Sequence, residues 1–306
     1  MSDIKLFSIT KNKVTELEGK SVTIEKALQL LIEKHLETFL GVSFIATEYS
    51  TGEKHAGRID TLGVDENNCP VIIEYKRALN ENVVNQGLYY LDWLLDHKAE
   101  FKLLVMKTKG NEAAENIEWE NARVICIAGD YTKYDSHAVE QINRNIELIR
   151  YKKFDDLILF ELVNAKSQSD NVKASVRTSN KKVKGKNKYK TVEEFYESCT
   201  DDLKNRFDEL SQFIFNLGEG IQLKKMRWYF AFKKIKTFAS FAFQPVGDII
   251  QMWVHADLRT VKLEKGFTRD VSKVGHHGLG NLEIRIRNSE DLEKAKPFIL
   301  KSFEIS

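Results

Sequence analysis

The sequence predicts an α/β (α+β) protein, with a central sheet flanked by helices in its N-terminal part and a smaller α+β domain at its C-terminal end. Three features indicate this class: apolar residues at helical spacing before Gly41, short apolar strands that alternate with helical segments up to residue 128, and a sharp change of composition at residue 166. The 306 residues suffice for two domains, and the 42% of hydrophobic residues can fill their cores.

The first part of the chain predicts a hairpin, a helix and three strands. Residues 5–19 alternate as a short hairpin does, and apolar residues then recur at helical spacing from Ile24 to Leu36. Gly41 is a suitable residue to end this helix. The three strands that follow are expected at Val42–Tyr49, Gly57–Val64 and Val71–Tyr75.

The next segment predicts the rest of the first core. A helix with an apolar stripe is expected at Glu81–His97. Short apolar runs predict strands at Phe101–Met106 and Ala122–Ala128, with a polar helical piece between them. The predicted order is therefore helix, three strands, helix, strand, helix, strand.

A basic segment separates this domain, residues 1–165, from a second one. Residues 166–190 contain nine Lys or Arg, one Asp and few apolar residues, which favours a flexible tether over a packed element. The alternative is a basic arm that contacts nucleic-acid phosphates.

The second domain, residues 191–306, predicts an α+β fold. Residues 191–214 are helical in pattern, residues 226–256 are rich in strand formers, and a last strand and helix follow, with Ser289 as the cap of that helix. Residues 223–234 combine basic residues with aromatic residues. This mixture suits nucleic-acid or partner binding, and it also fits a strand that packs its aromatic residues inward.

Composition excludes several classes of protein. The three cysteines are isolated and form no CxxC pair, so neither a disulfide framework nor a zinc site is expected, and a reducing cytoplasm fits best. No apolar run reaches the length of a membrane span, so no membrane partner is expected. The net charge of +2 does not demand a nucleic-acid partner by itself.

The segment "GRIDTLGVDENNCPVIIEYKR", residues 57–77, carries the strongest functional signal. Acid-x-Lys tripeptides are frequent, but the copy at Glu74–Lys76 ends a buried strand that lies one turn after a strand with Asp60. Strand alternation places Glu74 and Lys76 on one face, with Tyr75 opposite. Two adjacent strands can then bring the Asp60 and Glu74 carboxylates together.

This set of residue types suits phosphodiester hydrolysis. Two carboxylates are hard oxygen ligands for Mg²⁺ or Mn²⁺, and the metal would polarise a phosphate. Lys76 would position or deprotonate the attacking water, provided that its pKa is lowered by the cation and by burial.

Residues 20–130 resemble the PD-(D/E)xK superfamily of restriction-endonuclease-like nucleases, in particular the branch with the NucS-type and RecB-type domains. The resemblance rests on Asp60, Glu74 and Lys76, on the order of elements, and on "QGLYY", which matches the Q-x-x-x-Y element of that branch with Gln86 and Tyr90. One departure is Ile59, where the superfamily pattern has Pro. The C-terminal segment resembles a small domain of unknown function, sometimes labelled "predicted transport protein", that is often appended to such nucleases.

The resemblance implies a central mixed sheet and a Mg²⁺-dependent deoxyribonuclease in DNA repair, restriction or defence. Asp60, Glu74 and Tyr75 are the expected metal residues, with Lys76 serving the water. Gln86 and Tyr90 would position the nucleic-acid strand. A homodimer is compatible with this activity, since nucleases that cut both strands often dimerise.

The family often has a further acid on the first helix, for which Glu33 is the first choice and Glu37 the alternative. Other interpretations remain open for the whole protein. The carboxylates and the lysine could form a structural cluster in an inactive, nucleic-acid-binding relative of these nucleases. Gln86 and Tyr90 could be the polar edge of an ordinary helix. The protein could also act through its second domain, by binding a protein or a small ligand.

Overall fold

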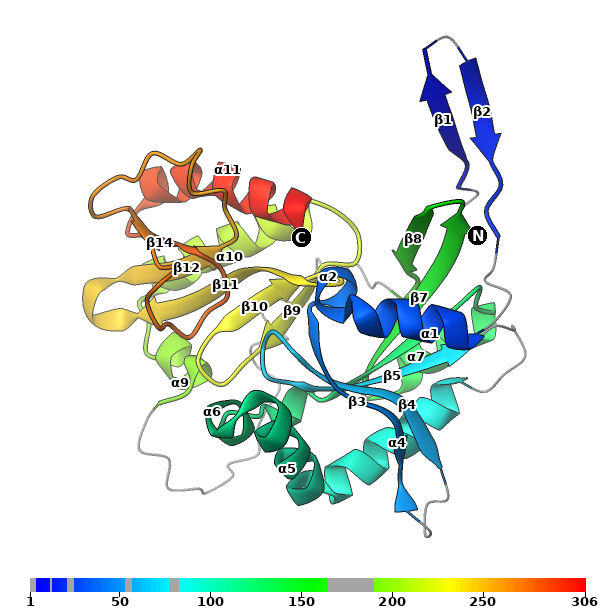
Figure 1. Ribbon diagram of the computed structural model, residues 1–306. Helices are drawn as coiled ribbons and strands as arrows, with labels where there is room; N and C mark the ends of the chain where they lie inside the picture. The colour runs from blue at the N-terminus through cyan, green and yellow to red at the C-terminus, as the bar shows by residue number, and fades with distance from the viewer. Residues whose placement is uncertain (1–3, 12, 21–24, 53–56, 77–82, 165–189) are drawn as a thin grey trace. The chain divides into compact units, whose positions relative to one another are not determined.

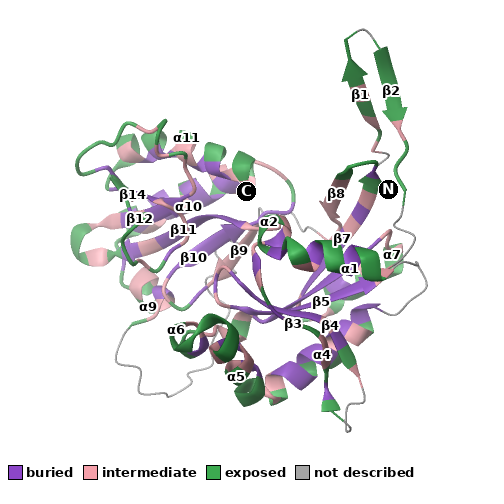
Figure 2. Ribbon diagram, viewed as in Figure 1, coloured by how far each residue is buried: buried purple, intermediate pink, exposed green. Residues whose placement is uncertain are grey.

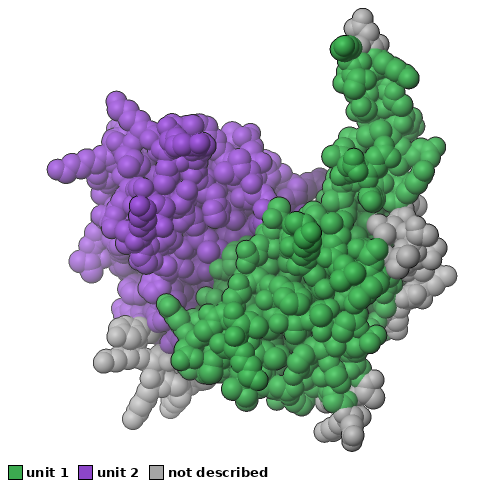
Figure 3. All heavy atoms as spheres, in the orientation of Figure 1, with its two compact units in different colours: residues 1–164 green, residues 165–306 purple. Residues whose placement is uncertain are grey.

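The computed structural model describes residues 4–11, 13–20, 25–52, 57–76, 83–164 and 190–306. The chain divides into two compact units, Met1–Asn164 and Ala165–Ser306 (Figure 3). The predicted linker lies outside the described residues except for Lys190. No helix within the described ranges is long and apolar enough to cross a bilayer.

The first unit is built on a six-stranded mixed sheet of order β3-β4-β5-β6-β7-β8 (Figure 1). The β5/β6 and β6/β7 pairs are parallel and the other pairs are antiparallel. This confirms the predicted mixed sheet with flanking helices. Its strands are β3 (Val42–Ser50), β4 (Arg58–Asp65), β5 (Pro70–Lys76), β6 (Arg123–Ala128), β7 (Asn145–Phe154) and β8 (Leu157–Leu162).

The helices of this unit lie on both faces of the sheet. Thr61 and Leu62 are neighbours in β4 and point to opposite faces. Thr61 bonds to Glu33 of α1, whereas Leu62 belongs to the buried cluster that α4 residues also form (Figure 2). The helical segments are α1 (Glu25–Lys34), α2 (Leu36–Leu40), α4 (Val83–Asp96), α5 (Lys98–Lys109), α6 (Asn111–Glu115), the 3-10 turn η1 (Trp119–Asn121) and α7 (Lys133–Gln141).

The N-terminal elements agree with most expectations. The hairpin forms as β1 (Leu6–Thr10) and β2 (Lys13–Leu17). Gly41 ends α2 in the left-handed conformation with φ 64°, and its N–H donates to the Glu37 carbonyl, which confirms it as the C-terminal residue. The predicted first helix is interrupted at His35, so that α1 and α2 are separate.

One predicted strand is wrong. Phe101–Met106 lies within helix α5. Phe101 and Val105 are buried four residues apart, while Leu103 is 53% exposed, which is the burial pattern of a helix. A run of six residues with five apolar ones cannot by itself distinguish a strand from a helix.

The second unit is a six-stranded antiparallel sheet of order β13-β14-β12-β11-β10-β9. Alternate strand residues, Phe230 and Phe232 among them, share a core with α10 and α11. The elements are α9 (Val192–Glu197), α10 (Asp201–Phe215), β9 (Gln222–Lys225), β10 (Phe230–Lys233), β11 (Thr237–Gln244), the 3-10 turn η2 (Pro245–Gly247), β12 (Ile249–Val254), β13 (Thr268–Asp270), β14 (Leu282–Ile286) and α11 (Ser289–Ile305).

The cap of α11 differs from the expected one. Ser289 is the first residue of the helix, and the cap is Asn288, whose Oδ1 accepts a hydrogen bond from the Asp291 N–H at 2.8 Å. Asn and Ser are equally favoured as caps, so the sequence alone could not show which of these two adjacent residues caps the helix.

Candidate active site

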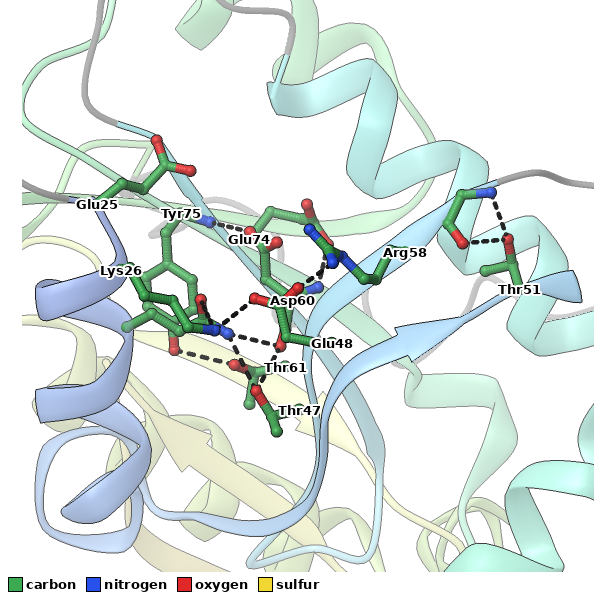
Figure 4. Close-up of polar contacts among 12 residues, drawn as sticks. Glu25, Lys26, Thr47, Glu48, Thr51, Arg58, Asp60, Thr61, Glu74 and Tyr75 are labelled. Atoms are coloured by element: carbon green, nitrogen blue, oxygen red, sulfur yellow. Dashed lines mark hydrogen bonds and ion pairs between the residues drawn. The ribbon is translucent and has the colours of Figure 1, made fainter.

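The site lies where β4 and β5 separate. Their backbone ladder includes the Thr61–Ile73 pair, and Asp60 and Glu74 come next on the two strands. The Asp60 N–H donates to Glu74 Oε1 at 3.2 Å, and the Tyr75 N–H donates to Asp60 Oδ2 at 3.0 Å. Carboxylate oxygens thus accept the amide hydrogens that a continued ladder would give to carbonyls, and the two acids are fixed side by side (Figure 4).

Burial disfavours the charged form of both carboxyl groups. Burial, and then the nearby charge of Asp60, raise the pKa of Glu74 to about 9. Burial also raises the pKa of Asp60, although the Tyr75 N–H and the charge of Lys76 oppose the change. Glu74 Oε2 is buried and has no hydrogen-bond partner among the described residues. An unpartnered buried oxygen beside a second carboxylate is suited to a cation.

Lys76 follows Glu74 by two residues, as expected for one face of β5. Its positive charge lowers the pKa values of both Asp60 and Glu74. Lys76 Nζ lies 3.9 Å from Glu25 Oε1 of α1, and the lysine side chain is 16% exposed. A largely buried ammonium close to two buried carboxyls can bind an anion or a water molecule.

The predicted helix acid, Glu33, lies on the other face of β4. Its Oε1 accepts hydrogen bonds from Thr61 Oγ1 at 2.6 Å and from Gln29 Nε2 at 3.0 Å. Gln29 Nε2 also donates to the Asp60 carbonyl at 2.9 Å. Glu33 is therefore linked through Gln29 to the main-chain carbonyl of Asp60. The α1 acid that contacts Lys76 is Glu25.

The alternative acid, Glu37, has other partners. It accepts a hydrogen bond from Ser43 Oγ at 2.7 Å and pairs with Lys109 at 3.5 Å. The Ser43 hydroxyl, followed by the charge of Lys109, lowers the pKa of Glu37. Glu37 therefore belongs to an ion pair at the surface.

The Tyr75 side chain points to the Thr61 face, as the alternation of β5 predicts. Its hydroxyl receives a hydrogen bond from Thr61 Oγ1 at 3.3 Å. Burial raises the pKa of Tyr75, so the phenol stays protonated at neutral pH. Any metal contact from Tyr75 would therefore come from its main chain.

Gln86 and Tyr90 lie one turn apart on α4 and contact each other. Gln86 Nε2 donates to the Tyr90 hydroxyl at 3.4 Å. The same hydroxyl accepts the Arg58 N–H at 3.1 Å, two residues before Asp60. The pair thus holds α4 to the beginning of β4, on the side of the sheet where Asp60 lies.

A third acid faces Asp60 from the neighbouring strand. Thr47 pairs with Thr61 and Tyr49 with Ile59, so Glu48 is opposite Asp60 in the register. Its carboxylate binds Lys26 of α1 and Arg58 of β4 (Figure 4). The Lys26 hydrogen bond is the main reason that the pKa of Glu48 is lowered, and the Glu48 charge raises the pKa of Asp60.

The donor set fits a hard divalent cation that keeps part of its water shell. Asp60 and Glu74 supply two carboxylates, one of them with an orphaned oxygen. In the parts of the chain that the structure describes, no group of three or more His, Cys, Asp or Glu side chains is arranged to hold a metal. A cation here would thus depend on water and substrate for its remaining ligands.

Sequence reasoning missed several residues that the structure brings to this site. Glu25 and Gln29 precede Glu33 by eight and four residues, so all three share one face of α1, and this spacing was a usable signal. Arg58 lies two residues before Asp60, which is again the same-face spacing of a strand. Glu48 lies on the strand expected next to that of Asp60 and was interpreted as structural, whereas Lys26 gave no signal, because its meeting with Glu48 depends on the pairing of α1 with β3.

The fold and the carboxylate pair define a two-domain protein with a mixed-sheet α/β core that has buried acids at one end of its central strands. The chain belongs to the family of an uncharacterized protein from Haemophilus influenzae, with which it is 30% identical over 298 residues, covering 95% of this chain and 96% of that protein. No family model matches the sequence.

Two solved structures are similar to part of the chain. One is a repair endonuclease from Pyrococcus abyssi, at 22% identity and a TM-score of 0.29, over 45% of this chain and 51% of that one. The other is a structure of an EndoMS-dsDNA2 complex, at 19% identity and a TM-score of 0.26, over 44% and 47%. The chain spans about half the length of each, and both TM-scores are low, so neither similarity determines the function of this chain.

Proposed function

We propose that the N-terminal unit is a metal-dependent nuclease that hydrolyses phosphodiester bonds of DNA. The observation that carries this proposal is the buried Asp60–Glu74 pair, which leaves Glu74 Oε2 without a partner and has Lys76 beside it. Buried like charges are costly unless a cation or a proton compensates them. Strongly perturbed carboxyl groups of this kind are concentrated at catalytic sites.

Asp60 and Glu74 would hold Mg²⁺ or Mn²⁺. When bound there, the cation supplies Lewis-acid polarisation of the phosphodiester. The chain's own residues do the rest: the Tyr75 N–H orients Asp60, the Asp60 N–H orients Glu74, and Lys76 holds the attacking water or the developing negative charge. Gln86 and Tyr90 position the beginning of β4. They would also position the nucleic-acid strand that is cut.

The test is a cleavage assay on circular and linear DNA, single- and double-stranded, with Mg²⁺ or Mn²⁺. We expect the wild type to cut, and Glu74→Ala and Lys76→Ala each to lower the rate by a hundredfold or more, as is typical for losing a group that acts in the transition state. Lys102→Ala and Glu115→Ala are matched controls, because these residues pair with each other at 2.8 Å on α5 and α6. Equal cutting by all variants would place the activity elsewhere or in a contaminant.

One observation favours a second candidate, a nucleic-acid-binding module without catalysis. Among the described residues, no third His, Cys, Asp or Glu side chain completes a metal-binding group with Asp60 and Glu74. DNA binding without cutting under every metal condition would select this alternative.

A further inference from the structure

Glu48 combines a strained backbone with an unusual position. Its φ is 50°, in the left-handed region that residues other than glycine rarely adopt. It faces Asp60 across the β3/β4 pair, in the middle of a strand. Strained residues of this kind persist only where surrounding contacts hold them, and they concentrate at functional sites.

The contacts that hold Glu48 are two cations. Lys26 Nζ and Arg58 Nε bind its two oxygens, the latter at 2.6 Å. Both basic side chains are accessible, at 47% for Lys26 and 68% for Arg58, whereas Glu48 itself is 27% exposed. Exposed ion pairs contribute little net free energy, so another anion can exchange for the Glu48 carboxylate at small cost.

Both cations are also tied to the strand that carries Asp60. The Arg58 N–H donates to the Tyr90 hydroxyl, and Arg58 precedes Asp60 by two residues on the same face of β4. Lys26 Nζ donates to Gln29 Oε1 at 3.1 Å, and Gln29 donates to the Asp60 carbonyl. Arg58 is therefore carried by the strand of Asp60 itself, and Lys26 is linked to the Asp60 main chain through Gln29.

A phosphodiester needs such charges to approach this site. Asp60, Glu74 and Glu48 are three acids on adjacent strands, and they repel a polyanion unless cations compensate them. Arg58 offers a planar fork that matches phosphate oxygens, and Lys26 offers a compact charge.

We propose that Lys26 and Arg58 form a phosphate-binding pair for the nucleic-acid strand at this site, and that Glu48 holds both cations until a phosphate displaces it. The inference deepens the proposed nuclease function and rests on it for the identity of the ligand. Glu48 is thus a competitor of the substrate phosphate, and its strained conformation keeps its carboxylate within reach of both cations.

The experiment measures binding of a fluorescent DNA oligonucleotide to the full chain in EDTA, over a range of salt concentrations. Without metal no cutting is expected, so the readout does not depend on catalysis. We expect the combined Lys26→Ala and Arg58→Ala variant to bind roughly tenfold more weakly or worse at low salt, with the salt slope reduced by about 1 for each side chain. Unchanged affinity and slope, or no binding by the wild type at low salt, would overturn the proposal.

A second variant tests the role of Glu48. Glu48→Gln keeps the shape and removes the charge, so it should tighten binding, and this gain should vanish when Lys26 and Arg58 are also replaced by Ala. Glu37→Gln, which removes an acid paired with Lys109, and Lys102→Ala are the matched controls for a general change of charge. A gain from Glu48→Gln that persists without the two cations would contradict the competition.

The two proposals fail in different ways. Cleavage by the wild type together with unchanged binding by the double variant removes the phosphate pair and leaves the nuclease. Loss of binding in the double variant, when the wild type binds but does not cut, leaves the phosphate pair and removes the nuclease.

Discussion

The two ends of β4 bury acidic side chains under opposite conditions. At its C-terminal end, Asp65 pairs with Arg123 at 3.2 Å and accepts the N–H groups of Asn67 and Cys69, and Arg123 also binds Glu147. Near its N-terminal end, Asp60 lies against another acid, Glu74, and each carboxylate accepts a hydrogen bond from a main-chain N–H.

The difference separates a cluster whose charges are compensated from a pair of like charges with no comparable compensation. The Asp65 cluster buries its charges with a counterion and with hydrogen bonds, which is how a buried charge becomes tolerable. Among the described residues, each cluster has one buried atom without a hydrogen-bond partner, Arg123 Nη2 and Glu74 Oε2, so the difference lies in the charges. The Asp60 pair has raised pKa values, so it decreases the stability of the metal-free fold. We expect substitutions at the two ends to act in opposite directions.

The largest effect is expected for Arg123→Ala. It leaves Asp65 and Glu147 buried without their counterion, and the free energy of unfolding should fall by about 3–5 kcal/mol, as when one partner of a buried ion pair is removed. Urea titration measures the change. The control is Arg58→Ala on β4, whose exposed side chain should cost about 0.5 kcal/mol or less. An Arg123→Ala protein as stable as the control would contradict the structural role of the cluster.

The next largest effect has the opposite sign. Because the pKa of Glu74 rises from its usual 4.5 to about 9 on folding, the unfolded chain loses this proton first as pH increases. The resulting cost is absent below pH 4.5, grows as pH rises, and is complete above pH 9. In metal-free buffer at pH 7, Glu74→Gln should therefore stabilise the protein by about 3 kcal/mol, while cleavage is expected to be lost.

The matched substitution at the other cluster is Glu147→Gln, which should destabilise the protein because Arg123 loses a charged partner. Urea titrations of both variants between pH 4.5 and 9 provide the comparison. A Glu74→Gln protein that is less stable than the wild type across this whole range would show that the Asp60 pair is compensated within the chain.

A smaller effect is expected from metal. If Mg²⁺ or Mn²⁺ binds the Asp60 pair, a concentration ten times the Kd stabilises the folded protein by about 1.4 kcal/mol. A thermal unfolding scan should show this gain in the wild type and in Glu115→Gln, and not in Asp60→Asn. An equal gain in Asp60→Asn would place the metal elsewhere.

The smallest effect concerns the strained residue opposite Asp60. Glu48→Gly and Glu48→Ala remove the same carboxylate, but only glycine adopts a φ of 50° without strain, so the glycine variant should be more stable by about 1 kcal/mol. At Ser50, which lies in the same strand without a positive φ, glycine should be the less stable choice. The two pairs of variants can be compared by urea titration, and equal stability of both Glu48 variants would mean that no strain is stored there.

The sequence was sufficient to predict that Asp60 meets Glu74, because this follows from strand alternation across one turn. The mixed sheet was expected from the family resemblance, and its strands β7 and β8 were not predicted. It could not show which α1 acid meets Lys76, because Glu25 and Glu33 share a helix face and only packing decides which end lies near the strand ends. The contacts of Glu48 could not be predicted from the sequence for another reason. An irregularity between Phe44 and Ala46 shifts the register of β3, and one residue of shift moves a side chain to the other face.

The crossed hydrogen bonds of the carboxylate pair have a practical consequence. The amide protons of Asp60 and Tyr75 each bind directly to an oxygen of a candidate ligand, so their chemical shifts depend on the charge of that oxygen. Occupancy of the pair by a proton or a cation should therefore move these two main-chain resonances in the NMR spectrum of the unaltered protein. Mg²⁺ has no spectroscopic signal of its own in such an experiment, and the backbone of this chain supplies one.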